Sequence, residues 1–131
     1  MANPFDSVRQ LEKAIAEYTG APYCVAVTSC TMALMLAVAW HLKKRSYEEW
    51  LVSNFPPIEI PCHTYVGVGH SILNAGGRVM FREQKWRGFY ELAPFRIYDS
   101  ARWFSSGMYQ EIDTQDEQVR RARGGMFGVH R

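Results

Sequence analysis

The chain has 131 residues, of which 47% are hydrophobic, 14% aromatic and 21% charged. This composition excludes a disordered chain, and the length is enough for one hydrophobic core but short for two, so we expect a single domain over residues 1–131. Fifteen basic and 13 acidic residues give a net charge of +2, which argues against a nucleic-acid-binding protein.

The apolar segments of the sequence are too interrupted to predict a membrane span. The longest of them, residues 25–40, is broken by Thr28, Ser29 and Thr31. The first residues also lack the basic and apolar regions that are typical of a signal peptide. We therefore expect no association with a membrane.

The three cysteines form an odd set without the paired spacings of zinc sites or disulfide scaffolds. They are Cys24, Cys30 and Cys62, and His63 stands beside the last of them. A metal site needs more ligands than that pair supplies, so we expect no metal. Unpaired thiols are typical of a reducing compartment, which favours a cytoplasmic protein.

The first predicted element is an amphipathic helix. Residues 7–10 read Ser-Val-Arg-Gln, which is a capping-box pattern, and apolar residues then recur at helical spacing as far as Tyr18. Gly20 comes shortly afterwards, and glycine commonly ends a helix. We expect this helix to begin at Ser7 and to stop near Gly20.

A strand, a turn and a helix are predicted over residues 23–40. The apolar, β-branched run of residues 23–27 predicts a buried strand. Residues 28–31 are small and mostly carry hydroxyls, and the segment 32–40 is apolar around most of its circumference, which predicts a buried helix. A helix that opens directly after a buried strand directs free N–H groups to a crevice where an anion can bind. Hydroxyl residues at this place are also ordinary N-caps.

The remaining elements continue the alternation of helices and strands. In chain order we expect a helix over 46–51, a strand over 58–60, a helix over 66–75 closed by Gly76 and Gly77, a strand over 78–82, a polar loop over 84–88 with aromatic cover from Trp86, Phe89 and Tyr90, a strand over 95–98, an extended segment over 104–109 and a helix over 114–123. This order predicts an α/β layered domain with a mostly parallel sheet.

Polar residues follow three of the predicted strands. They are residues 28–31, residues 62–65, and the pair Asp99 and Ser100. Because the C-terminal ends of parallel strands share one edge of a sheet, we expect hydroxyls, free N–H groups, an aromatic ring and a carboxylate to gather there. Such a set suits a phosphorylated, planar, cationic heteroaromatic ligand.

Three motifs carry a resemblance to a known family. They read Ala-Val-Thr-Ser-Cys-Thr-Met-Ala-Leu over 26–34, Ile-Pro-Cys-His-Thr-Tyr over 60–65 with Gly-Gly-Arg-Val-Met-Phe over 76–81, and Ile-Tyr-Asp-Ser-Ala over 97–101. In this order and spacing, they make residues 5–109 resemble the N-terminal half of the large domain of DegT/DnrJ/EryC1/StrS-type aminotransferases. These are fold-type I enzymes that use pyridoxal 5′-phosphate (PLP), and most of them transfer an amino group from glutamate to a nucleotide-linked keto-sugar.

The resemblance implies roles for five residues. Cys30 and Thr31 would hold the cofactor phosphate through backbone N–H groups and the Thr31 hydroxyl. Tyr65 would stack on the pyridine ring, and Asp99 would accept the ring N–H and so keep the pyridinium protonated. Arg102 stands where the family has Gln or His. Without the resemblance, Tyr65 would simply pack at the sheet edge and Asp99 would cap a turn.

Two features depart from the family pattern. Cys30 replaces a glycine, and its Cβ restricts the turn. The Schiff-base lysine, expected after Asp99 in a Ser-Phe-x-x-x-Lys segment, is absent, so no catalytic residue is assigned. Some members carry a histidine in its place, and His130 is the candidate here. The lysines of the chain are Lys13, Lys43, Lys44 and Lys85.

We therefore expect a truncated or split aminotransferase-like domain that keeps much of the PLP site. It would bind PLP weakly and without a covalent bond, and it would form a homodimer or a complex with a complementary chain. Two other interpretations remain open. One is a non-catalytic binding or assembly module, and the other is an unrelated nucleotide-binding α/β domain.

Overall fold

The computed structural model describes residues 3–44 and 56–112. The chain divides into two compact units, one made of residues 1–26 and 104–131 and the other of residues 27–103. The helices predicted over 46–51 and 114–123 lie outside the described residues. Among the described helices, none combines the length and the apolar character needed to cross a membrane.

Helix α1 (Asp6–Thr19) ends as predicted but begins differently. Gly20, with a φ of 78°, closes the helix and donates its N–H to the carbonyl of Ala16. The predicted capping box is wrong, because the N-cap is Phe5 and its side chain makes no capping hydrogen bond. Asn3 accepts the Phe5 N–H at 3.0 Å, so a turn before the helix takes the place of the box.

Residues 104–112 pack against the end of α1 within the first unit. The rings of Tyr18 and Phe104 stack with their centroids 5.2 Å apart, and the Gly107 N–H donates to the Tyr18 carbonyl at 2.9 Å. Gly107 has a φ of 71°, and a helical stretch follows it directly. The extended segment predicted over 104–109 is therefore wrong in its second half, because a left-handed glycine turns the chain there.

Residues 23–27 are not the predicted buried strand. The side chains of Tyr23 and Val25 are 86% and 77% exposed, and no strand of the described part of the chain pairs with this segment. Ala26 is tied to α1, since its N–H donates to the carboxylate of Glu12 at 2.8 Å. A strand needs a neighbour for its backbone groups, and the sheets of the described residues are built from other segments.

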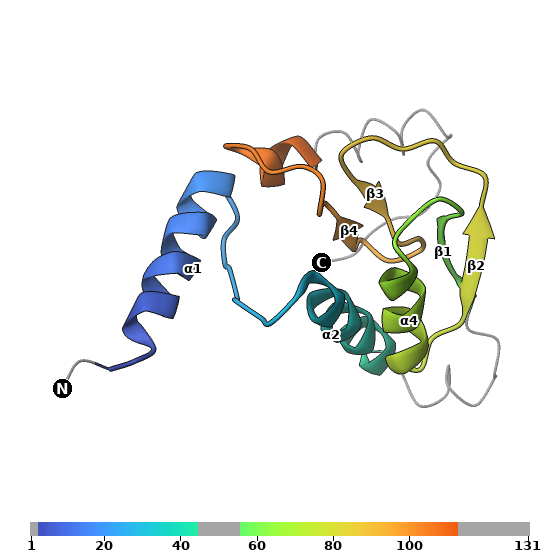
Figure 1. The fold of residues 1–131 in the computed structure, drawn as a ribbon, viewed down its shortest axis with the longest axis horizontal. Helices are drawn as coiled ribbons and strands as arrows, with labels where there is room; N and C mark the ends of the chain where they lie inside the picture. Colours follow the sequence, from blue (N-terminus) through green and yellow to red (C-terminus); the bar gives the residue numbers. More distant parts are fainter. Residues whose placement is uncertain (1–2, 45–55, 113–131) are drawn as a thin grey trace. The chain divides into compact units, whose positions relative to one another are not determined.

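The parallel strands of the second unit match their predictions (Figure 1). β1 (Ile58–Pro61) pairs with β2 (Val79–Arg82), and Ile58 stands opposite Val79. Ile60 is fully buried, and Ile58 is 1% exposed. The alternating helices and this parallel pair confirm the α/β class.

The second pair of strands is antiparallel and differs from the prediction. β3 (Tyr90–Glu91) pairs with β4 (Tyr98–Asp99), so that Tyr90 stands opposite Asp99. The sequence predicts only aromatic cover at Tyr90 and a strand over 95–98. The pairing places the strand at Tyr98 and Asp99, because these are the residues that stand opposite Glu91 and Tyr90.

Helix α2 (Cys30–Lys43) is buried on one side only. Leu34 and Val38 belong to the core, whereas Leu36 and Trp40 are 50% and 60% exposed. The prediction of a helix buried around most of its circumference is therefore wrong. An apolar stripe of α2 remains uncovered.

Helix α4 (Val66–Asn74) packs against α2 and lies between it and the parallel strands in Figure 1. Ser71 is fully buried, and its hydroxyl donates to the carbonyl of Gly67 at 2.7 Å and lies 3.0 Å from that of Thr31. This contact ties α4 to the first turn of α2. The helix ends before Gly76 as predicted.

One hydrophobic core joins the helices and strands of this unit. Its buried residues are Leu34, Val38, Ile58, Ile60, Val68, Ile72, Tyr90, Leu92, Phe95 and Ile97. Both strand pairs contribute to it, so the edge that carries the polar residues rests on a shared core.

We expect opposite effects on stability from alanine at two glycines of this unit. A Cβ on Gly77 would lie 2.9 Å from Cγ2 of Ile72 and 3.2 Å from Cδ1 of Ile58, so Gly77→Ala should lower the free energy of unfolding by about 1–3 kcal/mol. A Cβ on Gly69 would meet nothing within 4 Å, so Gly69→Ala should raise it by about 0.5–1 kcal/mol through helix propensity. Urea unfolding followed by circular dichroism measures both. Shifts in the same direction would contradict this packing.

Candidate functional site

Three polar segments of the second unit meet at the end of β4. Asp99 closes that strand, Cys30 opens α2, and Thr64 lies in the turn after β1. The Cys30 Sγ lies 4.0 Å from Oδ1 of Asp99. The Thr64 Oγ1 lies 2.6 Å from the Tyr90 hydroxyl, which donates to Oδ2 of Asp99 at 2.7 Å. The structure thus brings together the three clusters that were predicted to share one edge.

The carboxylate of Asp99 is buried and held by uncharged donors. The residue is 7% exposed, and its Oδ1 accepts the N–H of Ala101 at 3.0 Å while its Oδ2 accepts the Tyr90 hydroxyl. The ion pairs among the described residues lie elsewhere, at Lys13–Glu17 and Arg82–Glu59. A buried carboxylate that has no cationic partner among the described residues favours the approach of a cationic N–H donor.

The two groups that hydrogen-bond to this carboxylate through a side chain are kept protonated. Burial raises the pKa of the Tyr90 hydroxyl far above its usual range, and the carboxylate of Asp99 raises it further, whereas the hydrogen bond from Thr64 acts in the opposite direction. Burial also raises the pKa of the Cys30 thiol, and the charge of Asp99 adds to the effect. Both groups are therefore neutral donors at neutral pH.

Hydroxyls and N–H groups surround the beginning of α2. The Ser29 hydroxyl accepts the Met32 N–H at 3.1 Å and so acts as the N-cap. The first N–H groups of a helix have no partner within the helix, and the positive end of its dipole lies there. Cys30 and Thr31 occupy these first positions, which suit an anion.

Tyr65 and Thr31 approach each other over Gly67. A Cβ on Gly67 would lie 2.5 Å from the Tyr65 ring and 3.2 Å from the Thr31 Oγ1. The Tyr65 side chain is 70% exposed, so its ring lies against α4 and remains open to solvent. The sequence signal for this close approach is the glycine in the first turn of a predicted helix.

Arg102 does not contact Asp99 in any interaction of the described residues. Its guanidinium lies over the ring of Trp86, with Cζ 5.8 Å from the ring centroid. Trp86 in turn donates its Nε1–H to the carbonyl of His63 at 2.8 Å and packs edge-on against Tyr90 at 4.8 Å. The contact recorded for Arg102 is thus with Trp86 and not with the carboxylate.

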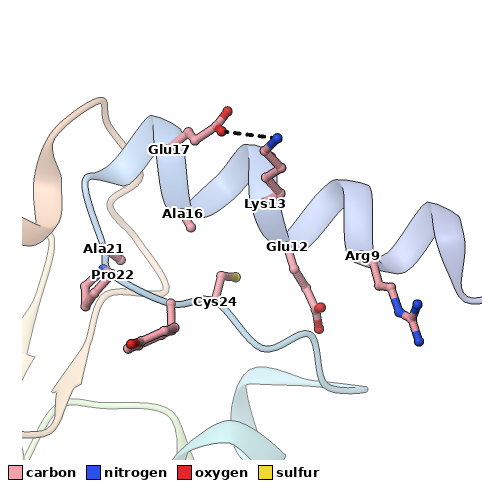
Figure 2. Close-up of a pocket in the computed structure, with 9 residues that line it drawn as sticks. Arg9, Glu12, Lys13, Ala16, Glu17, Ala21, Pro22 and Cys24 are labelled. Carbon is pink, nitrogen blue, oxygen red and sulfur yellow. Dashed lines mark ion pairs between the residues drawn. The ribbon is translucent and has the colours of Figure 1, made fainter.

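One hollow adjoins the site, and another lies in the first unit. One, of about 220 Å³, adjoins the site and includes Thr64 and Tyr65 among apolar residues of β1, α4 and β2. The other, of about 430 Å³, belongs to the first unit and lies between α1 and residues 21–24. Figure 2 shows Lys13 and Glu17 pairing on one side of α1, while Glu12 projects towards the segment after Cys24, where it accepts the Ala26 N–H. None of the predicted site residues lines this second hollow.

A comparison with protein families relates this geometry to a known family of enzymes. The sequence pattern of the DegT/DnrJ/EryC1/StrS aminotransferase family matches residues 2–88. The chain belongs to this family. No curated protein and no solved structure gave a match. The match includes the first turn of α2 and the turn after β1, whereas Asp99 lies beyond it, so its role in this family member depends on the contacts described above.

Enzymes of the DegT/DnrJ/EryC1/StrS family generally depend on PLP, and the residues present fit parts of that cofactor. Asp99 offers an acceptor for a ring N–H, Thr31 and the start of α2 offer donors for a phosphate, and Tyr65 offers an aromatic surface. The lysines do not complete the set. Lys43 and Lys44 lie at the far end of α2, about 20 Å from Cys30, given the length of a 14-residue helix. His130 lies outside the described residues.

Two residues of this family member's site were not predicted. Tyr90 appears in the sequence only as an aromatic residue after a loop, and its contact with Asp99 follows from the β3–β4 register. Thr64 belongs to a cluster that was predicted at the edge, but its hydroxyl was given no role. The sequence signal that could have identified Tyr90 is a polar aromatic residue near the start of a short strand.

We expect the buried Tyr90 to make the stability of the protein fall at high pH. Its raised pKa means that the unfolded chain loses the phenol proton near pH 10 while the folded chain keeps it. The stabilisation is present below that pH and is lost as pH rises, with a slope of at most about 1.4 kcal/mol per pH unit. Urea unfolding at pH 9 to 11 should show this slope in the wild type and less of it in Tyr90→Phe. Identical slopes in the two proteins would contradict the burial of this hydroxyl.

Proposed function

We propose that this chain forms the part of a PLP-dependent aminotransferase site that binds the phosphate and the ring nitrogen of the cofactor. With a lysine supplied by a partner chain, the complete site would transfer an amino group from glutamate to a nucleotide-linked keto-sugar. Alone, the chain would bind PLP weakly, reversibly and without a covalent bond. The unpaired cysteines favour a reducing, cytoplasmic setting.

The environment of Asp99 is the observation that carries this proposal. A carboxylate taken out of water loses hydration that uncharged donors replace only in part. Tyr90 and Ala101 supply such donors. A ligand with a cationic N–H would add the missing charge and form a charge-assisted hydrogen bond.

The start of α2 is the second support. Thr31 offers a hydroxyl there, and the unpaired N–H groups and the helix dipole favour a phosphate. Family membership supports PLP as the source of this phosphate, since the matched residues 2–88 include the whole turn.

Each of these residues has a limited task. Asp99 keeps a ring nitrogen protonated, Thr31 orients the phosphate, and Tyr65 shields one side of a planar ring from water. When bound, PLP supplies a protonated pyridine ring that withdraws electrons from the substrate carbon. No interaction of the described residues joins a lysine to Asp99, and we assign the proton transfers at that carbon to a base supplied by the partner chain.

Replacing Asp99 by asparagine tests the proposal. Asp99→Asn preserves the shape of the side chain and removes its charge, so the affinity for PLP should fall by roughly 1.5–3 kcal/mol. Absorbance titration of wild type and variant with PLP measures the difference, and thermal melts of both report the fold. Glu59→Gln, which alters another carboxylate of the same unit, should leave the affinity unchanged.

The binding should also reverse on dilution, and treatment with borohydride should leave no cofactor attached to the chain. Equal affinities of wild type and Asp99→Asn, together with equal melts, would remove the main support for a PLP site. A covalently labelled peptide that contains Lys85 would contradict the non-covalent mode of binding.

We also propose that the chain associates with a second copy or with a complementary chain through α2. Met32, Leu36 and Trp40 recur every four residues and are 37%, 50% and 60% exposed, so they form one apolar stripe on the helix. Contiguous exposed apolar patches mark interaction surfaces. The same stripe also favours the alternative function, a non-catalytic assembly module.

Leu36→Lys should weaken this association. Placing a charge in the middle of the stripe should lower the mass measured by sedimentation equilibrium towards that of one chain, at protein concentrations of roughly tens of micromolar. Leu73→Lys is the matched control, because Leu73 is a similarly exposed leucine on α4. A wild-type protein that sediments as a compact monomer at this concentration would contradict the association.

A further inference from the structure

A line of three hydroxyl and carboxyl groups runs through the second unit beside the start of α2. The Thr64 Oγ1 lies 2.6 Å from the Tyr90 hydroxyl oxygen, and that hydroxyl donates to Oδ2 of Asp99 at 2.7 Å. Tyr90 is 2% exposed and Asp99 is 7% exposed. The line is thus shielded from water over most of its length.

The direction of the hydrogen bonds in this line is fixed. A phenol carries one hydrogen, and Tyr90 directs it to the charged carboxylate, so the Thr64 hydroxyl must be the donor in the other contact. Hydrogen bonds that point the same way polarise one another in a buried setting. Thr64 therefore strengthens the donation from Tyr90 to Asp99.

Two contacts hold Tyr90 in place, and a third anchors the tryptophan that packs against it. The β3–β4 register sets Tyr90 opposite Asp99 on the same face of the pair. The ring of Trp86 packs edge-on against the Tyr90 ring at 4.8 Å, and the Trp86 Nε1–H is anchored on the carbonyl of His63 at 2.8 Å. The phenol cannot leave Asp99 without disturbing the β3–β4 pairing or the packing against Trp86.

We propose that Tyr90 is a positioning residue of this site, which holds the carboxylate of Asp99 in one orientation for a cationic ring N–H and is itself oriented by Thr64. This inference rests on the proposed function, because it presumes that Asp99 receives the ring nitrogen. Tyr90 engages Oδ2, and the N–H of Ala101 engages Oδ1 at 3.0 Å. With one donor on each oxygen the carboxylate plane is set, and the weaker contact from the Cys30 thiol, at 4.0 Å, is the one that a stronger donor can replace.

Two ligands distinguish a positioning role of Tyr90 from a general role in stabilising the fold. PLP carries the ring nitrogen, and its analogue with C–H in place of that nitrogen does not. In the full-length chain, Tyr90→Phe should weaken PLP binding about fivefold, in line with the loss of one buried hydrogen bond, and should leave the affinity for the analogue unchanged. Thr64→Val should weaken PLP binding to a smaller extent, again with no effect on the analogue.

The outcomes are distinct. An equal loss of affinity for both ligands, or no loss for either, would overturn the positioning role. If the wild type binds neither ligand, the proposed function fails, and the positioning role is then decided on the protein without ligand. The ¹³C side-chain carboxyl signal of Asp99 at pH 7 should be one sharp line in the wild type and should broaden or double in Tyr90→Phe. An unchanged line would overturn the inference. If Tyr90→Phe does not fold, Thr64→Val gives the same test through the neighbouring group.

Discussion

The polar edge of the second unit depends on the burial of one carboxylate. Asp99 loses most of its hydration at 7% exposure, and uncharged donors from separate segments have to replace it. Tyr90 brings β3 to this point, and Cys30 brings the first turn of α2. The turn after β1 joins through Thr64, which contacts Tyr90 rather than the carboxylate. The arrangement of all these segments therefore follows from satisfying a single buried charge.

Much of this edge could be predicted, because its strand ends have strong local signals. The apolar run before Pro61 and the Gly76–Gly77 pair before β2 mark a parallel unit with a crossover helix, and the structure has both. Once the strands are parallel, the residues that follow them must meet at one edge. This rule accounts for Thr64 alone, because residues 23–27 before Cys30 form no strand and the strand that ends at Asp99 is antiparallel to its neighbour. Cys30 and Asp99 reach the same place through the contacts of α2 and β4 with the rest of the unit.

The remaining features depend on tertiary partners that local composition does not specify. Tyr90 contacts Asp99 because two strands of two residues each happen to pair, and nothing in such short segments specifies a partner. The prediction for residues 23–27 fails for the opposite reason. Their composition is typical of a strand, but the described residues provide no neighbouring strand for it to pair with. The same holds for α2. Its apolar residues predict burial on every side, but only one side packs against the hydrophobic core. Local composition reports what a segment can bury, and tertiary contacts decide what it does bury.

Cys30, at the position where the resemblance predicts a glycine, is compatible with the carboxylate for a physical reason. A thiolate 4.0 Å from Asp99 would place two negative charges side by side in a partly buried setting. Burial and the charge of Asp99 both raise the pKa of Cys30, so the thiol stays protonated at neutral pH and acts as a weak donor instead. The substitution therefore does not remove the negative charge at this edge. It adds one more neutral donor to a carboxylate that still has no cation among the described residues, and this unmet charge is what a protonated ring nitrogen would satisfy.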